Sequence, residues 1–474
     1  MSYKDMRGWL AKIEDFGELR RVDGADLEKE LGAVYELSWS KRSLPTIIYD
    51  RIPGYRPGYR IVTSAQSPRS VALTLGIPVG HDVLKMTQAL REKVFEVRRI
   101  PPKVVDSGPI LENVRLDGDV DLMEFPAPKW HELDGGAYMG TGDLVMTRDP
   151  DEGWVNVGTY RIQRHDRNTV GLYISPGKHG RIHREKYYSR GEPCPVAISF
   201  GHDPLLCVAA SASLPWGVCE YEYAGGLKGE PIEVITGPVT GLPIPAHSEL
   251  AIEGYTYPGE TKLEGPFGEY AGYYASGERQ EPFIHVKSVL HRNDPIIYGT
   301  PPLKPRAGAV GNIMRAATIW NGLERVGIPG VMGVAVYVRY FITVVSIKQL
   351  FPGHSKQVGA VAGQIPPGAY SGRLVIVVDD DIDPTNLDEV IWALATRSDP
   401  ALSIDFLHRC WSTPLDPMSN TGLLEDGPRV FNSRAIIDAC IPYELKSRNL
   451  FPAVVGTSPD LLASVEAKFG ALLE

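Results

Sequence analysis

Apolar side chains recur at helical spacing at the start of the chain. Over residues 6–16 they fall at every third or fourth position, which places them on one face of a helix. Further elements follow in the order helix, strand, strand, helix, at residues 27–37, 45–50, 59–64 and 67–75. This alternation predicts a small α/β unit over residues 1–105.

The pattern changes between residues 106 and 305. Short runs rich in Val, Ile, Thr and Tyr alternate with turns containing Gly, Pro and Asp, which is typical of an antiparallel barrel or sandwich. Strands are expected at residues 143–147, 154–163, 169–174, 196–200 and 232–236. No repeat of fixed period is present.

Residues 306–474 return to an α/β pattern, with a helix and three strands expected at 308–323, 334–338, 341–347 and 374–378. A last helix is predicted by Ser458 as its N-cap and Pro459 in its first turn. One side of this helix is apolar, with Leu461, Leu462, Val465, Phe469 and Leu472. Such a face needs a surface to cover, so we expect a homodimer or a larger ring of dimers, such as a homohexamer.

Composition excludes several classes of protein. The 474 residues carry a formal net charge of -9, which is unlike a nucleic-acid-binding protein. The first residues are charged and no run of 18 apolar residues occurs, so neither a signal peptide nor a membrane span is expected. The five scattered cysteines predict no disulfide framework. We therefore expect a cytoplasmic protein.

The segment Glu-Gly-Pro-Phe-Gly-Glu-Tyr at residues 264–270 is the first candidate for chemistry. Pro266 and two glycines prevent a regular helix, so Glu264 and Glu269 flank a shaped turn. Two carboxylates in a dry site repel, so one of them retains its proton near neutral pH and suits a general acid. Taken alone, a surface turn with two solvated glutamates explains the segment equally well.

Residues 156–163 form the second candidate. Alternation along a strand would put Asn156, Gly158 and Tyr160 on one face. Thr159 and Arg161 would lie on the other face, together with Val157. An arginine inside a barrel needs an anionic partner, either a glutamate of the turn or a substrate carboxylate. The alternative is an arginine on the solvent-exposed face of the strand. Taken alone, this segment favours the alternative.

Asn156, His179 and Glu220 are candidate metal ligands. An oxygen-rich set with one imidazole suits Mn²⁺ or Mg²⁺ better than Zn²⁺. Sequence spacing does not link the three residues, and a histidine in a Gly-rich turn is more often solvated or structurally bonded. The carboxylate pair also leaves open a hydrolase such as a glycosidase.

Together these segments resemble the UbiD family of reversible (de)carboxylases. The family pattern of Glu, Gly-Pro-Phe-Gly and an acidic residue stands at 264–269, followed by Gly-Tyr at 272–273. Its Asn and Arg five residues apart stand at Asn156 and Arg161, with His179 further on. Its Glu-Tyr-x-x-Ala-Gly stands at residues 220–225. The order of these motifs favours buried roles over the solvated alternatives.

The resemblance implies a multidomain α/β (α+β) fold with a central split β-barrel that binds flavin. It implies prenylated FMN, made by a flavin prenyltransferase, together with Mn²⁺ and often K⁺. Asn156, His179 and Glu220 match the metal ligands, and Trp154, Ala210 and Ser211 match backbone contacts of K⁺. The implied cofactor-binding residues are Asn156, Gly158, Thr159, Tyr160, Arg161, Lys178, His179, Ser211, Glu220 and Lys356, with Lys356 at the phosphate.

The resemblance also implies the reaction, a reversible non-oxidative decarboxylation with Arg161, Glu264 and Glu269 as the catalytic trio. Loss of CO₂ from an sp² carbon leaves a carbanion-like centre, for which the modified flavin is an electron sink. Glu269 is then the proton donor and Arg161 orients both carboxylates. Glu264 keeps this network in register. An inactive family member acting as a binding or assembly protein is the remaining alternative.

The substrate class is an aromatic, heteroaromatic or α,β-unsaturated acid. An extra buried cation beside the pocket would favour a second anionic group, as in a furan dicarboxylate. The candidate cations are Lys178, His291, Arg306, Arg315 and Arg339. Alternatively, these cations pair with acidic side chains or with the flavin phosphate. Leu415, in the expected pocket-side loop 411–418, is the candidate for shaping the substrate site.

Overall fold

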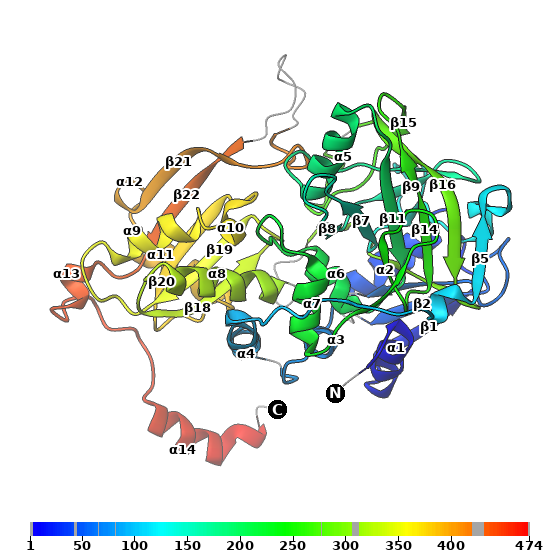
Figure 1. Ribbon diagram of the computed structural model, residues 1–474. Coiled ribbons are helices and arrows are strands. Elements are labelled where there is room, and N and C mark those ends of the chain that lie inside the picture. Colours follow the sequence, from blue (N-terminus) through cyan, green and yellow to red (C-terminus); the bar gives the residue numbers. More distant parts are fainter. Residues whose placement is uncertain are drawn as a thin grey trace.

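The computed structural model describes residues 3–41, 45–64, 66–80, 82–275, 277–305, 312–419 and 431–472. Within them the chain forms two bodies joined side by side, with the N-terminal segments and a curled sheet in one and an α/β domain in the other (Figure 1). The expected mixed α/β fold with a barrel-like centre is confirmed.

The N-terminal residues build a four-stranded sheet with helices beside it. Its strands stand in the order β1 (Leu19–Asp23), β2 (Thr46–Asp50), β3 (Arg60–Ser64) and β17 (Ile296–Gly299). The fourth strand therefore comes from much later in the chain. The helices beside it are α1 (Met6–Asp15), α2 (Glu30–Ser40) and α3 (Pro68–Leu75), whereas α4 (Val83–Phe95) packs against α8 (Ile313–Arg325) of the C-terminal domain. The apolar face of α1 is buried, as its spacing predicts.

The central sheet curls around its own core. Its main path runs β6 (Ala137–Gly140), β9 (Ile162–Arg164), β10 (Thr169–Gly171), β16 (Arg279–His291), β14 (Leu250–Thr256), β11 (Cys194–Phe200), β7 (Leu144–Arg148) and β8 (Val155–Gly158). Strands β15 (Thr261–Glu264) and β5 (Asn113–Leu116) pair with β16 off this path. Buried apolar residues from nearly every strand fill the interior, which fixes the wall that carries the site.

One expected strand is interrupted. Residues 154–163 split into β8 and β9, and Thr159–Arg161 between them has no strand conformation. The predicted alternation of faces is therefore wrong after Gly158, because a strand that bends away from its ladder no longer points successive side chains to opposite sides.

Helices that the sequence patterns did not predict cover the barrel. They are α5 (His179–Ser189), α6 (Pro204–Ala210) and α7 (Glu220–Lys228). A small sheet of β13 (Pro243–Pro245), β12 (Glu233–Thr236) and β4 (Lys103–Val104) packs nearby. α5 is strongly polar and α7 contains two glycines, so neither has a clear apolar period.

The C-terminal domain is a five-stranded sheet with helices on both faces. Its strands stand in the order β18 (Val331–Tyr337), β19 (Ile342–Ile347), β20 (Leu374–Asp379), β22 (Phe431–Ala439) and β21 (Ile404–Trp411). Its helices are α8 (Ile313–Arg325), α9 (His354–Ala362), α10 (Pro366–Ala369), α11 (Leu387–Arg397), α12 (Pro400–Ser403) and α13 (Tyr443–Lys446). α8 and α9 cover one face and α11 the other, so the central strands are buried on both sides.

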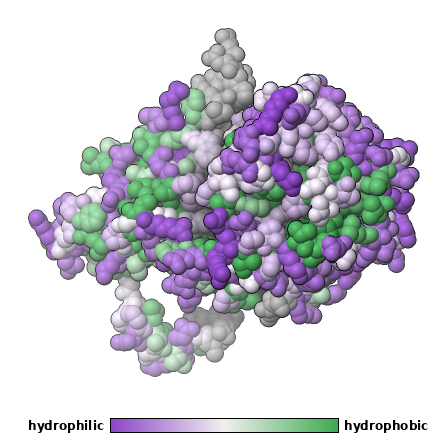
Figure 2. All heavy atoms as spheres, in the orientation of Figure 1, coloured by the Kyte–Doolittle hydropathy of each residue, from purple (hydrophilic) through white to green (hydrophobic). Residues whose placement is uncertain are grey.

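The last helix, α14 (Pro459–Phe469), begins as the sequence predicts. The Ser458 hydroxyl accepts a hydrogen bond from the Leu461 backbone N–H. The helix projects from the rest of the molecule at the end of an extended segment, and its apolar residues lie on the surface (Figures 1 and 2). None of its described side chains is buried within this chain, so the surface that its apolar face requires is not supplied by the chain itself.

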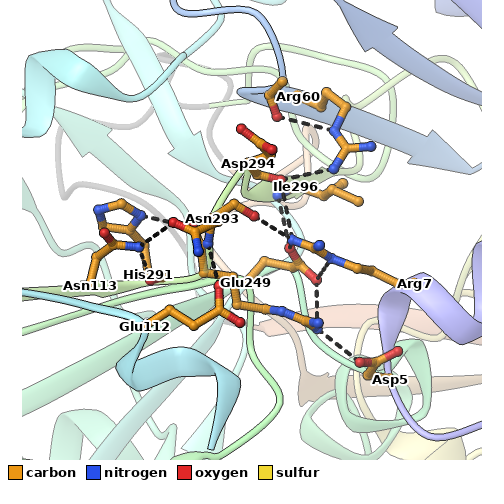
Figure 3. A network of polar contacts seen from close by, with 12 residues as sticks. Asp5, Arg7, Arg60, Glu112, Asn113, Glu249, His291, Asn293, Asp294 and Ile296 are labelled. Atoms are coloured by element: carbon orange, nitrogen blue, oxygen red, sulfur yellow. Dashed lines mark hydrogen bonds and ion pairs between the residues drawn. The ribbon is translucent and has the colours of Figure 1, made fainter.

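A buried ion-pair network fastens α1 to the central sheet (Figure 3). The Glu249 carboxylate, at the start region of β14, is 0% exposed. It accepts two hydrogen bonds from Arg7, at 2.9 and 2.8 Å, and one from Arg292 at 3.1 Å. Arg292 also donates to Asp5 at 2.8 Å. The N-terminal unit is thereby held to the barrel that carries the site.

In the part of the chain that the structure describes, no helix is both long and apolar enough for a membrane span. All five cysteines are free, as their spacing predicts.

Candidate active site

Arg161 joins the two glutamates of the turn. It lies directly before β9, while Glu264 ends β15 and Glu269 stands in the loop that leads to β16. The guanidinium donates two hydrogen bonds to Glu264, from Nε at 2.7 Å and from Nη2 at 2.6 Å. Its Nη1 donates to Glu269 Oε1. One planar cation therefore fixes the relative position of both carboxylates.

The trio is withdrawn from water. Glu264 is 1% exposed, Glu269 7% and Arg161 9%. Burial raises the pKa of Glu269 to about 7, against the lowering effect of Arg161 and with a further increase from the charge of Glu264. A carboxyl group with a pKa near neutrality can both give up and take up a proton at the pH of a cell.

Aromatic side chains enclose the trio. Tyr138 donates a hydrogen bond to Glu264 at 3.3 Å. The carbon at the centre of the Arg161 guanidinium lies 4.8 Å from the ring centre of Tyr173 and 5.6 Å from that of Phe267. These contacts hold the guanidinium plane in place and keep water away from it.

The predicted metal ligands lie together although their positions are far apart in sequence. Asn156 is in β8, and His179 and Glu220 are the first residues of α5 and α7. Glu220 accepts a hydrogen bond at 2.6 Å from the backbone N–H of Val157, next to Asn156. All three side chains line one cavity. Helix starts and one strand therefore bring the three donors to a common wall.

These donors fit a divalent cation. Burial raises the pKa of the Glu220 carboxyl to about 7, so a cation would replace a proton there. Asn156 would contribute its amide oxygen, because the amide nitrogen is a hydrogen-bond donor and does not bind a cation. No group of three His, Cys, Asp or Glu side chains forms a metal cage in the described ranges. Two such side chains and one amide leave coordination positions for oxygens of a ligand.

The cavity has a volume of about 320 Å³ and reaches from these donors to the trio. Every predicted cofactor-binding residue except Lys356 lines it: Asn156, Gly158, Thr159, Tyr160, Arg161, Lys178, His179, Ser211 and Glu220. Of the residues predicted to contact K⁺, Ala210 and Ser211 also line the cavity, whereas Trp154 packs edge-on against His179 with ring centres 5.5 Å apart.

Three residues predicted to affect the substrate lie at this cavity. Lys178 and Leu415 are part of its lining. Arg315 contacts two lining residues: it donates to the Tyr370 carbonyl at 2.7 Å and lies 4.3 Å from the Tyr340 ring centre. It therefore supports the tyrosines that form the wall.

Three predicted residues lie elsewhere. Lys356 pairs with Asp405 at 2.6 Å on the C-terminal domain, because a strand of that domain offers it a carboxylate. His291 packs in the barrel against Phe125, at a ring-centre distance of 5.1 Å, and does not reach the cavity. Arg339 is exposed on the turn after β18. Arg306 lies outside the described residues.

The C-terminal domain supplies a wall that sequence reasoning missed. It consists of Tyr340, Tyr370 and Trp411, and Tyr270 from the turn segment completes it. Tyr270 directly follows Glu269, so the motif itself could have indicated it. The other three have no local pattern that distinguishes them from core or surface aromatics.

Two family models match the chain. The model described as 3-octaprenyl-4-hydroxybenzoate carboxy-lyase Rift-related domain covers residues 103–305. The model of the corresponding C-terminal domain covers residues 309–439. Together they cover well over half of the chain, including every residue of the trio and of the donor set.

Similar proteins cover nearly the whole chain. A pyrrole-2-carboxylic acid decarboxylase from Pseudomonas aeruginosa is 31% identical over 92% of this chain and 91% of its own length. A phenolic acid decarboxylase from Sedimentibacter hydroxybenzoicus is 32% identical over 93% and 92%.

Solved structures agree with these relatives. The vanillic acid decarboxylase of Sedimentibacter hydroxybenzoicus superimposes with a TM-score of 0.83 at 30% identity, covering 100% of both chains. The UbiD-class enzyme HmfF from Pelotomaculum thermopropionicum, solved with FMN, has a TM-score of 0.82 at 28% identity and covers 97% of this chain and 99% of its own.

Proposed function

The chain belongs to the UbiD family of carboxy-lyases, and from this premise we propose that it decarboxylates an aromatic or heteroaromatic acid reversibly with prenylated FMN. One observation carries the proposal. Arg161 and Glu269 line the same cavity as the metal-type donors, and Glu264 completes the buried network through two hydrogen bonds from Arg161. The flavin complexes of UbiD-class neighbours at 28% and 26% identity support the cofactor.

The chain's own residues perform the proton and charge work. Arg161 attracts the substrate carboxylate to the cavity end and holds both glutamates in register. Glu269 donates the proton that replaces CO₂, since its pKa of about 7 allows it to carry that proton at neutral pH. Glu264 stays bound to Arg161 by two hydrogen bonds and supplies the balancing charge. When bound, the modified flavin supplies the electron sink for the carbanion-like centre.

Asn156, His179 and Glu220 would hold a divalent ion, for which we propose Mn²⁺, and this ion would supply positive charge for the flavin phosphate. Ala210 and Ser211, on the same wall, would provide backbone oxygens for K⁺. The ions would neutralise the phosphate and fix the position of the cofactor, without taking part in proton transfer.

The cavity supports a finer proposal about the substrate. The Lys178 side chain lines the cavity, and its ammonium lies 4.8 Å from the ring centre of Tyr370 in the aromatic wall. A cation in an apolar wall favours an acid with a second anionic group, such as a furan dicarboxylate. The named relatives act on pyrrole-2-carboxylic and phenolic acids, so one-ring acids are the class to test first.

The carboxylate pair does not belong to a hydrolase such as a glycosidase, because nearly the whole chain matches carboxy-lyases and both glutamates bind the same guanidinium. An inactive binding or assembly protein is disfavoured by the intact trio, and the turnover experiment decides it.

The experiment is decarboxylation-linked H/D exchange. The protein is co-produced with a flavin prenyltransferase, purified, and tested on one-ring monoacids and diacids in D₂O. We expect the purified protein to be coloured and to catalyse incorporation of deuterium at the decarboxylated carbon of the product. The exchange rate should be highest with diacids. Glu269→Gln should reduce exchange by at least about 1000-fold while the flavin stays bound.

The matched control is Glu260→Gln, which removes a carboxylate bonded to His285 before β15, away from the trio. It should leave exchange unchanged. Colourless wild-type protein without flavin, or normal exchange in Glu269→Gln, contradicts the proposal. Equal rates for monoacids and diacids contradict only the finer statement about the substrate.

A further inference from the structure

Arg279 closes the loop that carries the proposed proton donor. It is the first residue of β16, and its backbone pairs across the hairpin with Glu264, the last residue of β15. The loop between these two residues contains Glu269. Arg279 therefore stands at the base of this loop, directly opposite one carboxylate of the trio.

The Arg279 side chain reaches the wall of the cavity. Its guanidinium carbon lies 4.2 Å from the ring centre of Tyr173, and that of Arg161 lies 4.8 Å from the same ring. Tyr173 is 5% exposed and lines the cavity. The ring thus contacts two guanidinium groups, and attraction to both restricts its movement.

The trio alone is not balanced in charge. With both glutamates ionised, two negative groups share the single positive charge of Arg161 in a dry site. The charged and titratable groups that act on Glu269 are Arg161 from the β8–β9 link, Glu264 from β15, Tyr370 from the C-terminal domain and Arg279 from β16. Arg279 is thus the second cation, and its charge lowers the pKa of Glu269.

Glu281 competes for Arg279. The Arg279 Nε lies 3.5 Å from Glu281 Oε1, with the Glu281 side chain 13% exposed. This contact leaves Nη2 of Arg279 buried and without a hydrogen-bond partner among the described residues. The pair with Glu281 therefore does not satisfy the guanidinium, which also contacts the Tyr173 ring.

We propose that Arg279 is a positioning residue of this reaction, which holds Tyr173 against Arg161 and supplies the positive charge that balances the second carboxylate. Its effect on the reaction is to keep Glu269 able to lose and regain its proton near neutral pH. This inference rests on the proposed function only in treating Glu269 as the proton donor.

The test is an infrared titration of the full-length protein. Spectra of each protein are compared with the same protein carrying Glu269→Gln, so that the difference isolates the Glu269 carboxyl band. Arg279→Met keeps the apolar stem and removes the charge, Arg279→Lys keeps the charge, and Glu281→Gln removes the competing partner. No turnover is needed, so failure of the proposed function does not affect the readout.

We expect Arg279→Met to move the Glu269 midpoint upward by roughly one pH unit, because a nearby positive charge is lost. Arg279→Lys should restore it, and Glu281→Gln should leave it unchanged or lower it. An unchanged midpoint in Arg279→Met overturns the proposal. So does an equal upward shift in Arg279→Lys or in Glu281→Gln, since either result would mean that the charge of Arg279 is not the cause.

Folding is checked by circular dichroism. If Arg279→Met does not fold, Arg279→Gln replaces it. If no neutral variant folds, an upward shift in either Arg279→Lys or Glu281→Gln still overturns the proposal, and its absence in both supports it. In the flavin-loaded enzyme, the alkaline limb of the exchange rate should move with the same midpoint. If neither wild-type nor any variant exchanges deuterium, the proposed function is refuted, but the proposal about Arg279 is not.

Discussion

The Arg161 guanidinium binds the two glutamates in different ways. Its two-point contact with Glu264 takes Nε and Nη2, which leaves Nη1 for Glu269. Glu264 is therefore a fixed partner and Glu269 the more loosely held one, with a pKa raised to about 7. Two carboxylates of one turn thus take different roles because the cation treats them differently.

This raised pKa has a consequence for stability. The folded-state pKa of Glu269 lies above its ordinary value of 4.5, so the folded chain loses stability as the pH rises from 4.5 to about 7. The full loss is on the order of 3 kcal/mol. Glutamine resembles the protonated form of glutamate and does not titrate, so the Glu269→Gln variant does not undergo this loss of stability. We expect the free energy of unfolding of Glu269→Gln, relative to wild-type, to rise over this interval and then to level off.

Urea unfolding of the cofactor-free chain at pH 5 and pH 8 measures this difference. Glu260→Gln is again the control, and its difference from wild-type should not depend on pH. If the free energy of unfolding of Glu269→Gln, relative to wild-type, does not rise between pH 5 and pH 8, burial does not raise the pKa of Glu269.

At the scale of elements, α1 matters to the site through its attachment to the barrel. Glu249 is fully buried and is shared by Arg7 and Arg292. Removing it takes the carboxylate partner from Arg7 and leaves Arg292 with Asp5 alone of its two carboxylates, which costs more than the loss of an exposed pair. We expect Glu249→Ala to lower the free energy of unfolding by about 3 kcal/mol. Chemical denaturation measures this loss.

The comparison variant is Glu233→Ala, which removes a half-exposed carboxylate paired with His247, and it should cost about 1 kcal/mol or less. Equal losses for the two variants would mean that the network in Figure 3 contributes no more than a surface ion pair.

At the scale of the molecule, the site is shared between two bodies. The barrel provides the trio and the donor set, and the C-terminal domain provides Tyr340, Tyr370 and Trp411. A relative movement of the two bodies would therefore displace these C-terminal aromatic residues relative to the trio and the donor set.

The apolar face of α14 is exposed to solvent within this chain. Leu461, Leu462 and Val465 are 55%, 54% and 40% exposed. We propose that a second copy of the chain covers this face, which makes the protein a homodimer or a homohexamer. Leu461→Ser with Val465→Ser should lower the oligomeric mass measured by light scattering at several concentrations. Asp460→Ser, on the same helix, should not.

Much of the local structure was predictable from residue patterns. The spacing of apolar residues predicted α1 and α14, and the Pro and Gly residues of 264–270 predicted a turn between two carboxylates. α5 and α7 were missed because their residues lack an apolar period, and the strand at 154–163 was predicted too long. These errors concern segments whose conformation depends on neighbours distant in the chain.

The sequence by itself determined the family, the order of the motifs and the identity of the trio, because each motif is a short run with its own spacing. Only the tertiary structure decided which of these residues meet. It brought Arg161 to glutamates more than 100 positions away and kept Lys356 and His291 away from the cavity. It also placed the Arg279 guanidinium over the Tyr173 ring. Sheet register and helix starts set such distances, and neither can be read from local spacing.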